Sequence, residues 1–306
     1  MRRSFSTLLN SGLIKSSGFQ KIHQASLHTT VLQRLSQGDA TLDSTEPLIL
    51  VQHYNAITLI GLNRPLKRNA LNLDLLEALR KELKAFEAND LSTVAVLYGT
   101  GGNFCAGLDL EEISLNKHSI PLVDEFCCKP VVASINGYAV GEGFDLAMAC
   151  DVRVMEDQAI LGSFGRRFGV PMSEPALRRL SASAGFAITM ELILTGRPIK
   201  AEEALQRGLV QQTSRCGAGK GNALTLAQSL TKYPQDALRA DRAALLQTLQ
   251  LPDDFQTSLN SERTYTVPRA IEKMQSESKR FSEGIGKHGS FKNLTVQTGF
   301  PEWMKE

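Results

Sequence analysis

The stretch KPVVASINGYAVGEGFDLAMACD, residues 129–151, decides the fold. It opens with an apolar, β-branched run, Val131–Ile135, which is the pattern of a buried strand. Asn136 and Gly137 are turn residues, and Gly141-Glu142-Gly143 leads into a helical pattern. A helix that starts in such a turn has backbone N–H groups without partners, all pointing at one place. These donors suit a phosphate or an enolate oxygen, although a purely structural turn has the same pattern.

A second stretch of the same kind lies upstream. Val94–Tyr98 is a short buried strand, and the glycine-rich loop GTGGNFCAGLD, residues 99–109, leads from it to a helix at Leu110–Leu115. Two strand-to-helix loops with exposed N–H groups are able to converge on one ligand atom. A pair of such donors is what an oxyanion hole requires.

The remaining segments predict a hairpin and several helices. Leu48–Tyr54 and Ala56–Leu62 are apolar runs joined at Asn55, as in a hairpin. A helix follows, capped by Asn72 or Asp74. Its expected apolar stripe is Leu75, Leu76, Leu79, Leu83 and Phe86. Helical patterns recur downstream at Pro198–Gly208, Asn222–Leu230, Gln235–Gln250, Phe255–Tyr265 and Pro268–Phe281.

Composition excludes several classes of function. The chain has 306 residues, 42% of them hydrophobic and 22% charged, which is typical of a soluble globular protein. A net charge of +2 gives no reason to expect nucleic acid or a membrane as partner, and the first long helix mixes both signs of charge on its polar face. The five cysteines have neither disulfide nor zinc-site spacing. No metal, flavin or nicotinamide site is predicted.

The first 38 residues differ from the rest. They contain basic residues and many hydroxyl side chains, and no Asp or Glu precedes Asp39. That composition is typical of a mitochondrial presequence and predicts a protein of the mitochondrial matrix. The alternative is a disordered tail. The basic residues are Arg2, Arg3, Lys15, Lys21 and Arg34.

Four blocks together resemble the enoyl-CoA hydratase/isomerase, or crotonase, superfamily. They are NRPLKRNAL (63–71), FCAGLDL (104–110), PVVASINGYAVGEGFDLAMACD (130–151) and LILTGRPIKAEEALQRGLV (192–210). They occur in the family's order and cover about residues 47–285. RRFGVP (166–171) and GIGKHG (284–289) resemble the subgroup labelled generic enoyl-CoA hydratase.

The resemblance implies an α/β fold of the crotonase (ClpP-like) type. Residues 47–215 would form the core, a spiral of repeated β–β–α turns. Residues 216–306 would form a C-terminal helical region and tail, which in the family joins three subunits into a trimer and often two trimers into a hexamer.

The resemblance also implies that an acyl-CoA thioester is the substrate, with coenzyme A as part of it and no separate cofactor. The thioester oxygen would lie between the backbone N–H groups of Ala106 and Glu142. Neighbouring substrate contacts would come from Ala106, Gly107, Leu108, Asp109 and Gly141. The basic residues Arg64, Lys67 and Arg68 follow a strand end where the family binds the CoA nucleotide, and they form either a phosphate contact or a solvated loop.

Glu142 departs from the family, which usually has glycine or another small residue at this position. An ionised Glu142 that points inward would oppose enolate formation, whereas one that points outward would be harmless. A third alternative makes Glu142 itself an acid–base group.

The catalytic carboxylates depart from the family as well. The first glutamate of a hydratase aligns with Asp145, which is one methylene shorter, and Asp145 is the acid–base candidate. The second aligns with Gly165, so that acid is absent. Arg166 and Arg167 cannot act as bases near neutral pH. Glu174 is either a further acid of the pocket or a solvated charge at a helix start.

The sequence therefore predicts an acyl-CoA-binding enzyme of the hydratase/isomerase type that stabilises a thioester enolate. With one shortened acid, hydration by two carboxylates is disfavoured, and a single-acid isomerase or decarboxylase of CoA esters stays open. The other alternative is a catalytically degenerate trimer that binds CoA. The histidines His53, His118 and His288 have no catalytic pattern.

Overall fold

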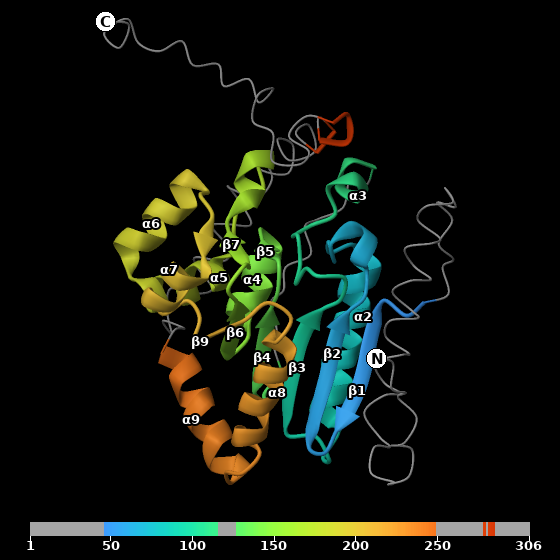
Figure 1. The fold of residues 1–306 in the computed structure, drawn as a ribbon, viewed down its shortest axis with the longest axis vertical. Helices are drawn as coiled ribbons and strands as arrows, with labels where there is room; N and C mark the ends of the chain where they lie inside the picture. The colour runs from blue at the N-terminus through green and yellow to red at the C-terminus, as the bar shows by residue number, and fades with distance from the viewer. Residues whose placement is uncertain (1–45, 116–126, 249–277, 280, 285–306) are drawn as a thin grey trace, which may run out of the picture. The chain divides into compact units, whose positions relative to one another are not determined.

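Two β-sheets organise the described part of the chain (Figure 1). The computed structural model describes residues 46–115, 127–248, 278–279 and 281–284. The larger sheet has the strand order β1-β2-β3-β4-β6-β9 and the smaller one the order β5-β7-β8. The strands are β1 (Ile49–Tyr54), β2 (Ile57–Leu62), β3 (Val94–Gly99), β4 (Val131–Ile135), β5 (Tyr138–Val140), β6 (Val152–Glu156), β7 (Ile160–Gly162), β8 (Ile199–Lys200) and β9 (Gln212–Ser214).

Helices connect and cover these strands. The α-helices are α2 (Leu73–Ala88), α3 (Leu110–Leu115), α4 (Glu142–Ala149), α5 (Glu174–Ala184), α6 (Phe186–Thr195), α7 (Ala201–Gln206), α8 (Gly219–Leu230) and α9 (Gln235–Thr248). Two short 3-10 helices are η1 (Pro65–Lys67) and η2 (Phe164–Phe168). No helix in the described part of the chain is both long and apolar enough to span a bilayer.

The larger sheet begins with the predicted hairpin. Asn55 takes a left-handed conformation (φ 52°) and joins β1 to β2, which pair antiparallel. From β2 to β9 every neighbouring pair is parallel. The carboxyl ends of these strands therefore lie along one edge of the sheet, where the loops after β2, β3 and β4 meet. Open parallel sheets commonly bind ligands at this edge.

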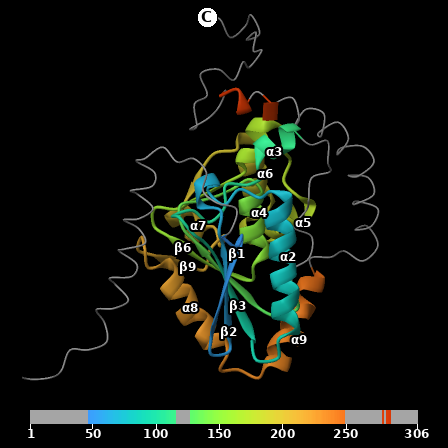
Figure 2. The same ribbon diagram turned by 90° about the vertical axis from the view of Figure 1, so that its right-hand side faces the viewer.

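Alternation along the strands divides the core between the two faces of the sheet. In β3, Val94, Val96 and Tyr98 belong to the apolar cluster that includes α8, whereas Ala95 and Leu97 pack with α2 and α4. Figure 2 shows α8 on one side of the sheet and α2 and α4 on the other. Such strands are apolar throughout because both of their faces are covered.

Helix α2 forms where its pattern predicts. The Asn72 side chain caps it by accepting a hydrogen bond from the Leu75 N–H at 3.0 Å. The predicted stripe is confirmed, because it is buried in full: Leu75, Leu76, Leu79, Leu83 and Phe86. Burial of each of these side chains stabilises the fold by about 1.5–3 kcal/mol before entropy is counted.

Several predicted elements differ from the observed ones. The segment predicted as one helix at Pro198–Gly208 contains strand β8 and the shorter helix α7, because Ile199 pairs with Leu161 in the smaller sheet. The sequence patterns predict none of the strands β5, β6, β7 and β9. The helical patterns at Asn222–Leu230 and Gln235–Gln250 correspond to α8 and α9.

Other predictions lie outside the described residues. These are the presequence at 1–38, the helix at Phe255–Tyr265 and all but three residues of the helix at Pro268–Phe281. The described residues from Pro47 onward belong to one compact unit. The division into a core at 47–215 and a C-terminal region at 216–306 stays a prediction.

Candidate active site

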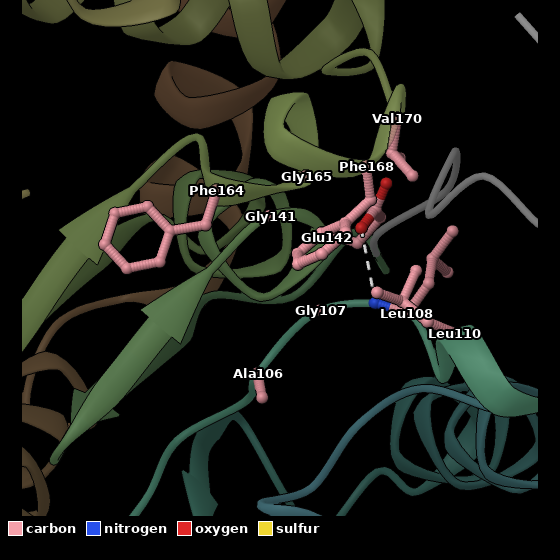
Figure 3. A pocket seen from close by; sticks show the side chains of 10 residues that line it. All are labelled: Ala106, Gly107, Leu108, Leu110, Gly141, Glu142, Phe164, Gly165, Phe168 and Val170. Carbon is pink, nitrogen blue, oxygen red and sulfur yellow. Dashed lines mark hydrogen bonds between the residues drawn. The ribbon is translucent and has the colours of Figure 1, made fainter. Parts of the chain in front are cut away.

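A cleft of about 610 Å³ opens where the loops after β2, β3 and β4 meet. Its walls come from residues 66–70, residues 106–111, strand β5, helix η2 and Phe281. Further in lies a small pocket of about 50 Å³, which shares Ala106, Leu108 and part of η2 with the cleft. Glu142 and Gly165 belong to the wall of this inner pocket (Figure 3).

Two glycines bring the site's backbone together. Gly141 precedes α4 with φ 56°, a conformation that favours glycine, and its carbonyl accepts the first N–H bonds of the helix. Gly107 has φ 92°, and a Cβ there would lie 2.9 Å from the Val140 oxygen and 3.4 Å from the Glu142 nitrogen. The loop after β3 therefore passes directly beside the start of α4.

The two N–H groups that flank Gly107 have different acceptors. The Ala106 N–H donates to the Arg68 carbonyl at 3.0 Å. The Leu108 N–H donates to the Glu142 carboxyl at 3.3 Å (Figure 3). The predicted donor at Ala106 is thus already bonded within the protein, and Leu108 presents its N–H to the inner pocket. From the sequence, Leu108 is expected only to contact the substrate. The direction of its N–H depends on the positive φ of Gly107, which the sequence does not reveal.

Glu142 points inward, so the alternative of a harmless outward side chain is wrong. The residue is 8% exposed, and its carboxyl lies at the inner pocket. Burial, together with the nearby charge of Asp145, raises the pKa of Glu142 to about 8. Glu142 therefore keeps its proton to a higher pH than an exposed glutamate does.

Asp145 lies one turn further along α4 and is 5% exposed. One of its oxygens, Oδ2, accepts a hydrogen bond from the Ser173 N–H at 2.9 Å, while buried Oδ1 has no partner among the described residues. Burial raises the pKa of Asp145 to about 7, although the bonds to Ser173 and the charge of Arg179 oppose the shift. Asp145 does not contribute to the wall of either the cleft or the inner pocket.

The position of the missing second acid is part of the inner pocket. A Cβ at Gly165 would lie 3.1 Å from the Val170 Cβ, so the space beside it is already filled. Glu174, the other candidate acid, forms an ion pair with Arg178 one turn along α5 and lies outside the cleft and the inner pocket. Of the site's acids, Glu142 alone borders the inner pocket.

The basic loop is largely neutralised by carboxylates. Arg64 forms an ion pair of 2.6 Å with Asp109, and Lys67 pairs with Glu111. Arg68 is exposed at the cleft wall and lies 5.9 Å from the centre of the Tyr138 ring. Among the described residues Arg68 has no carboxylate partner.

The remaining candidates for a site are the histidines and the cysteines. His53 is exposed on β1 and lies 3.2 Å from the Thr58 hydroxyl, whereas His118 and His288 lie outside the described residues. In the part of the chain that the structure describes, no three His, Cys, Asp or Glu side chains are grouped to hold a metal ion. All five cysteines are free thiols.

Comparison with known proteins identifies relatives that have enoyl-CoA hydratase or related names. Residues 52–285 match the family model described as enoyl-CoA hydratase/isomerase. The chain is 33% identical to 2,3-dehydroadipyl-CoA hydratase of Escherichia coli (strain K12), over 73% of this chain and 91% of the relative. It is 34% identical to enoyl-CoA hydratase domain-containing protein 3, mitochondrial, of Danio rerio, over 53% of this chain and 60% of the relative.

Solved structures have the same fold. An enoyl-CoA hydratase from Mycobacterium tuberculosis H37Rv superposes with a TM-score of 0.64 at 28% identity, covering 78% of this chain and all of that one. A monofunctional enoyl CoA isomerase from M. smegmatis superposes with a TM-score of 0.58 at 26% identity, covering 68% of this chain and 96% of that one. The chain therefore belongs to the enoyl-CoA hydratase/isomerase family and has the crotonase fold.

Proposed function

We propose that the protein is an acyl-CoA enzyme of the hydratase/isomerase type, which binds a CoA thioester in the cleft and stabilises its enolate. The supporting observation is the contact of 3.3 Å between the Leu108 N–H and the buried Glu142 carboxyl. A carboxyl oxygen that accepts a hydrogen bond there marks where a thioester oxygen would accept the same bond.

The proposed donors to that oxygen are the backbone N–H groups of Leu108 and Glu142. Leu108 replaces Ala106 in this role, because the Ala106 N–H is bonded to Arg68. The bond from Leu108 to Glu142 is longer than the usual 2.9–3.0 Å and therefore weak, so a thioester oxygen can displace the carboxyl at little cost. One such donor typically contributes about 10²–10³-fold to the rate.

The CoA part of the substrate would lie along the outer cleft. The cleft volume of about 610 Å³ is within the usual range for small-molecule sites. We assign the phosphate contact to Arg68, because Arg64 and Lys67 already have carboxylate partners. Asp109 has a supporting role, since it pairs with Arg64 and its Oδ1 accepts the Glu111 N–H at 3.1 Å at the start of α3.

Proton transfer by one carboxyl is the proposed chemistry, with double-bond isomerisation favoured over hydration. Hydration in this family uses two carboxylates, and Gly165 stands where the second would be. Isomerisation requires only one group that removes a proton from the acyl chain and returns it to another carbon. Relatives of the chain include proteins named as hydratases and one named as an isomerase.

One observation favours a second candidate, a degenerate protein that binds CoA esters without turnover. The Glu142 carboxyl accepts the Leu108 N–H, so the protein's own side chain occupies one donor of the proposed oxyanion hole. We also propose a homotrimer or hexamer in the mitochondrial matrix. The acid-free N-terminus and the mitochondrial relatives from Arabidopsis thaliana and Danio rerio support that location, although bacterial and peroxisomal relatives occur too.

Deuterium exchange tests the proposed function. The purified protein is incubated in heavy water with saturated, 2-enoyl and 3-enoyl CoA esters of several chain lengths. Calorimetry measures binding, and mass spectrometry follows deuterium uptake, water addition and double-bond movement. We expect binding together with deuterium at the α-carbon. Binding without exchange would establish the degenerate alternative, and a protein that neither binds nor exchanges any ester would overturn both.

A further inference from the structure

The two carboxyls in the first turn of α4 face different surroundings. Glu142 is part of the inner pocket wall, and Asp145 is not. We propose that Glu142 is the catalytic carboxyl of this site and that Asp145 is a positioning residue behind it. The proposal rests on the function proposed above, and it moves the acid–base role away from Asp145, the residue favoured by the sequence.

The two carboxyls start from one face of α4 but bond to different parts of the protein. Residues three apart in a helix lie on the same face, so Glu142 and Asp145 are neighbours. The Glu142 carboxyl reaches across the pocket wall to Leu108 (Figure 3). The Asp145 carboxyl is held by the N–H of Ser173, the residue that caps α5. One carboxyl thus faces the substrate cavity, while the other joins two packed helices.

The charged groups around Glu142 explain its role. Asp145 lies on the same helix, and its negative charge favours the protonated form of Glu142. Buried Cys105 faces it from the loop after β3, and Arg166 of η2 shares a stretch of wall with it. Arg179 of α5 interacts with Asp145. No described cation forms an ion pair with Glu142, so burial and Asp145 together raise the pKa of Glu142 to about 8.

A carboxyl that titrates near working pH suits proton transfer. The Glu142 carboxylate accepts the α-proton of the thioester, and the electrons of the broken C–H bond form the enolate. The negative charge on the thioester oxygen is stabilised by the N–H groups of Leu108 and Glu142. The neutral Glu142 carboxyl exchanges its proton with solvent deuterium and delivers a deuteron to the α-carbon, which gives exchange. With a 3-enoyl ester, delivery to the γ-carbon of the dienolate moves the double bond into conjugation with the thioester, which gives isomerisation.

Asp145 acts through Glu142 in this scheme. Its unpartnered Oδ1 is buried, and its Oδ2 is anchored to α5, so its charge has a fixed position. A fixed negative charge behind Glu142 makes the carboxylate of Glu142 a stronger base. The two residues thus have separable effects: loss of Glu142 removes the proton acceptor, whereas loss of Asp145 changes the pH at which the acceptor ionises.

The test compares Glu142→Gln, Asp145→Asn and a control, Glu174→Gln, in the full chain. Glu174 also stands in the first turn of a helix but lies outside the cleft and the inner pocket. Circular dichroism monitors folding, calorimetry gives the affinity for an ester that the wild type exchanges, and mass spectrometry gives the exchange rate as a function of pH.

We expect Glu142→Gln to bind the ester within about threefold of wild type and to lose about a hundredfold or more in exchange. Because exchange needs the carboxylate, the wild-type rate rises with pH and levels off above the pKa of Glu142. In Asp145→Asn the proton acceptor is still present, so exchange persists. The pKa of Glu142 falls in this variant, so the exchange rate rises at a pH lower by roughly one unit. A purely structural Asp145 would slow exchange without moving this rise. The control keeps the wild-type profile.

Three results would overturn the proposal. Exchange that survives in Glu142→Gln but vanishes in Asp145→Asn, with binding intact, returns the role to Asp145. Faster exchange in Glu142→Gln identifies Glu142 as an obstruction. If the wild type binds esters and exchanges none, the proposed function and this inference fail together. If Glu142→Gln does not fold, the pH profiles of Asp145→Asn and wild type still test the proposal. An exchange rate that rises over the same pH range in both proteins would contradict the proposed effect of Asp145 on the pKa of Glu142.

Discussion

Burial raises the pKa of both carboxyls in the first turn of α4. Glu142 and Asp145 are both buried, and no described cation forms an ion pair with either carboxyl. Their pKa values therefore rise to about 8 and about 7. Cys105, in the adjacent loop, is buried in the same way, and its pKa rises to about 12. Its thiol is a packing group and no nucleophile.

Stability should depend on pH through these carboxyls. Because the folded pKa values lie above the ordinary ones, the folded state binds more protons than the unfolded state between about pH 4 and pH 8. The free energy of unfolding should fall by a few kcal/mol as pH rises through this window. Urea unfolding at several pH values measures it. Glu142→Gln should flatten the dependence, whereas exposed Glu77→Gln should keep it; equal slopes in both would refute the account.

Among the elements, the loop after β2 depends on Asn69. This fully buried side chain accepts the Arg64 N–H at 2.8 Å and donates to the carbonyls of Thr100 and Asn103 at 2.9 and 2.7 Å. It ties the basic loop to the glycine-rich loop after β3. Both loops contribute to the cleft, so this amide helps to hold their separation, together with the Arg64–Asp109 ion pair and the bond from the Ala106 N–H to the Arg68 carbonyl.

Asn69→Ala should destabilise the protein and loosen the cleft. It leaves two half-buried carbonyls and one half-buried N–H without the Asn69 side chain as partner, which costs about 2–4 kcal/mol in the free energy of unfolding. Affinity for a CoA ester should also fall severalfold, as calorimetry would measure. Asn222→Ala, which removes one side-chain bond to Ser214 near α8, is the control. Equal effects of the two substitutions on affinity would contradict a role of Asn69 in the cleft.

At the scale of the whole molecule, the two faces of the larger sheet have different roles. One face contributes to stability only, whereas the other also supports the candidate active site. One face packs on α8 through a small cluster, whereas the other packs on α2 and α4, which adjoin the cleft. The α8 side is tightly fitted, because Ala223 and Ala227 are both fully buried against the strands.

Val132→Ala should lower the stability of the protein without changing its affinity for a CoA ester. Val132 is fully buried on the α8 side, and the loss of two methyl groups should cost about 1–3 kcal/mol in the free energy of unfolding. Affinity for a CoA ester should stay within about twofold of wild type at a temperature where the variant is folded. Chemical denaturation and calorimetry check the two outcomes. A large loss of affinity would indicate that packing on the α8 side reaches the site.

The sequence predicted the parts of the fold that local pattern controls. The hairpin at Asn55, the stripe of α2 and the strand β4 each follow from a periodicity of two or of 3.6 residues, or from a continuous apolar run. The short strands β5, β7 and β8 contain only two or three residues each. At that length no periodicity exists, and their pairing across the smaller sheet is set by distant partners.

The sequence by itself determined the family, the crotonase fold, the two glycine-rich loops and the absence of an acid at Gly165, because these depend on residue identity and order. Tertiary structure decided three further points: the Ala106 N–H is bonded to Arg68, the Leu108 N–H meets Glu142, and Glu142 rather than Asp145 borders the pocket. The direction of an N–H or a carboxyl depends on the dihedral angles of Gly107 and on the packing of α4 against α5. Those quantities arise only when segments distant in the chain come together.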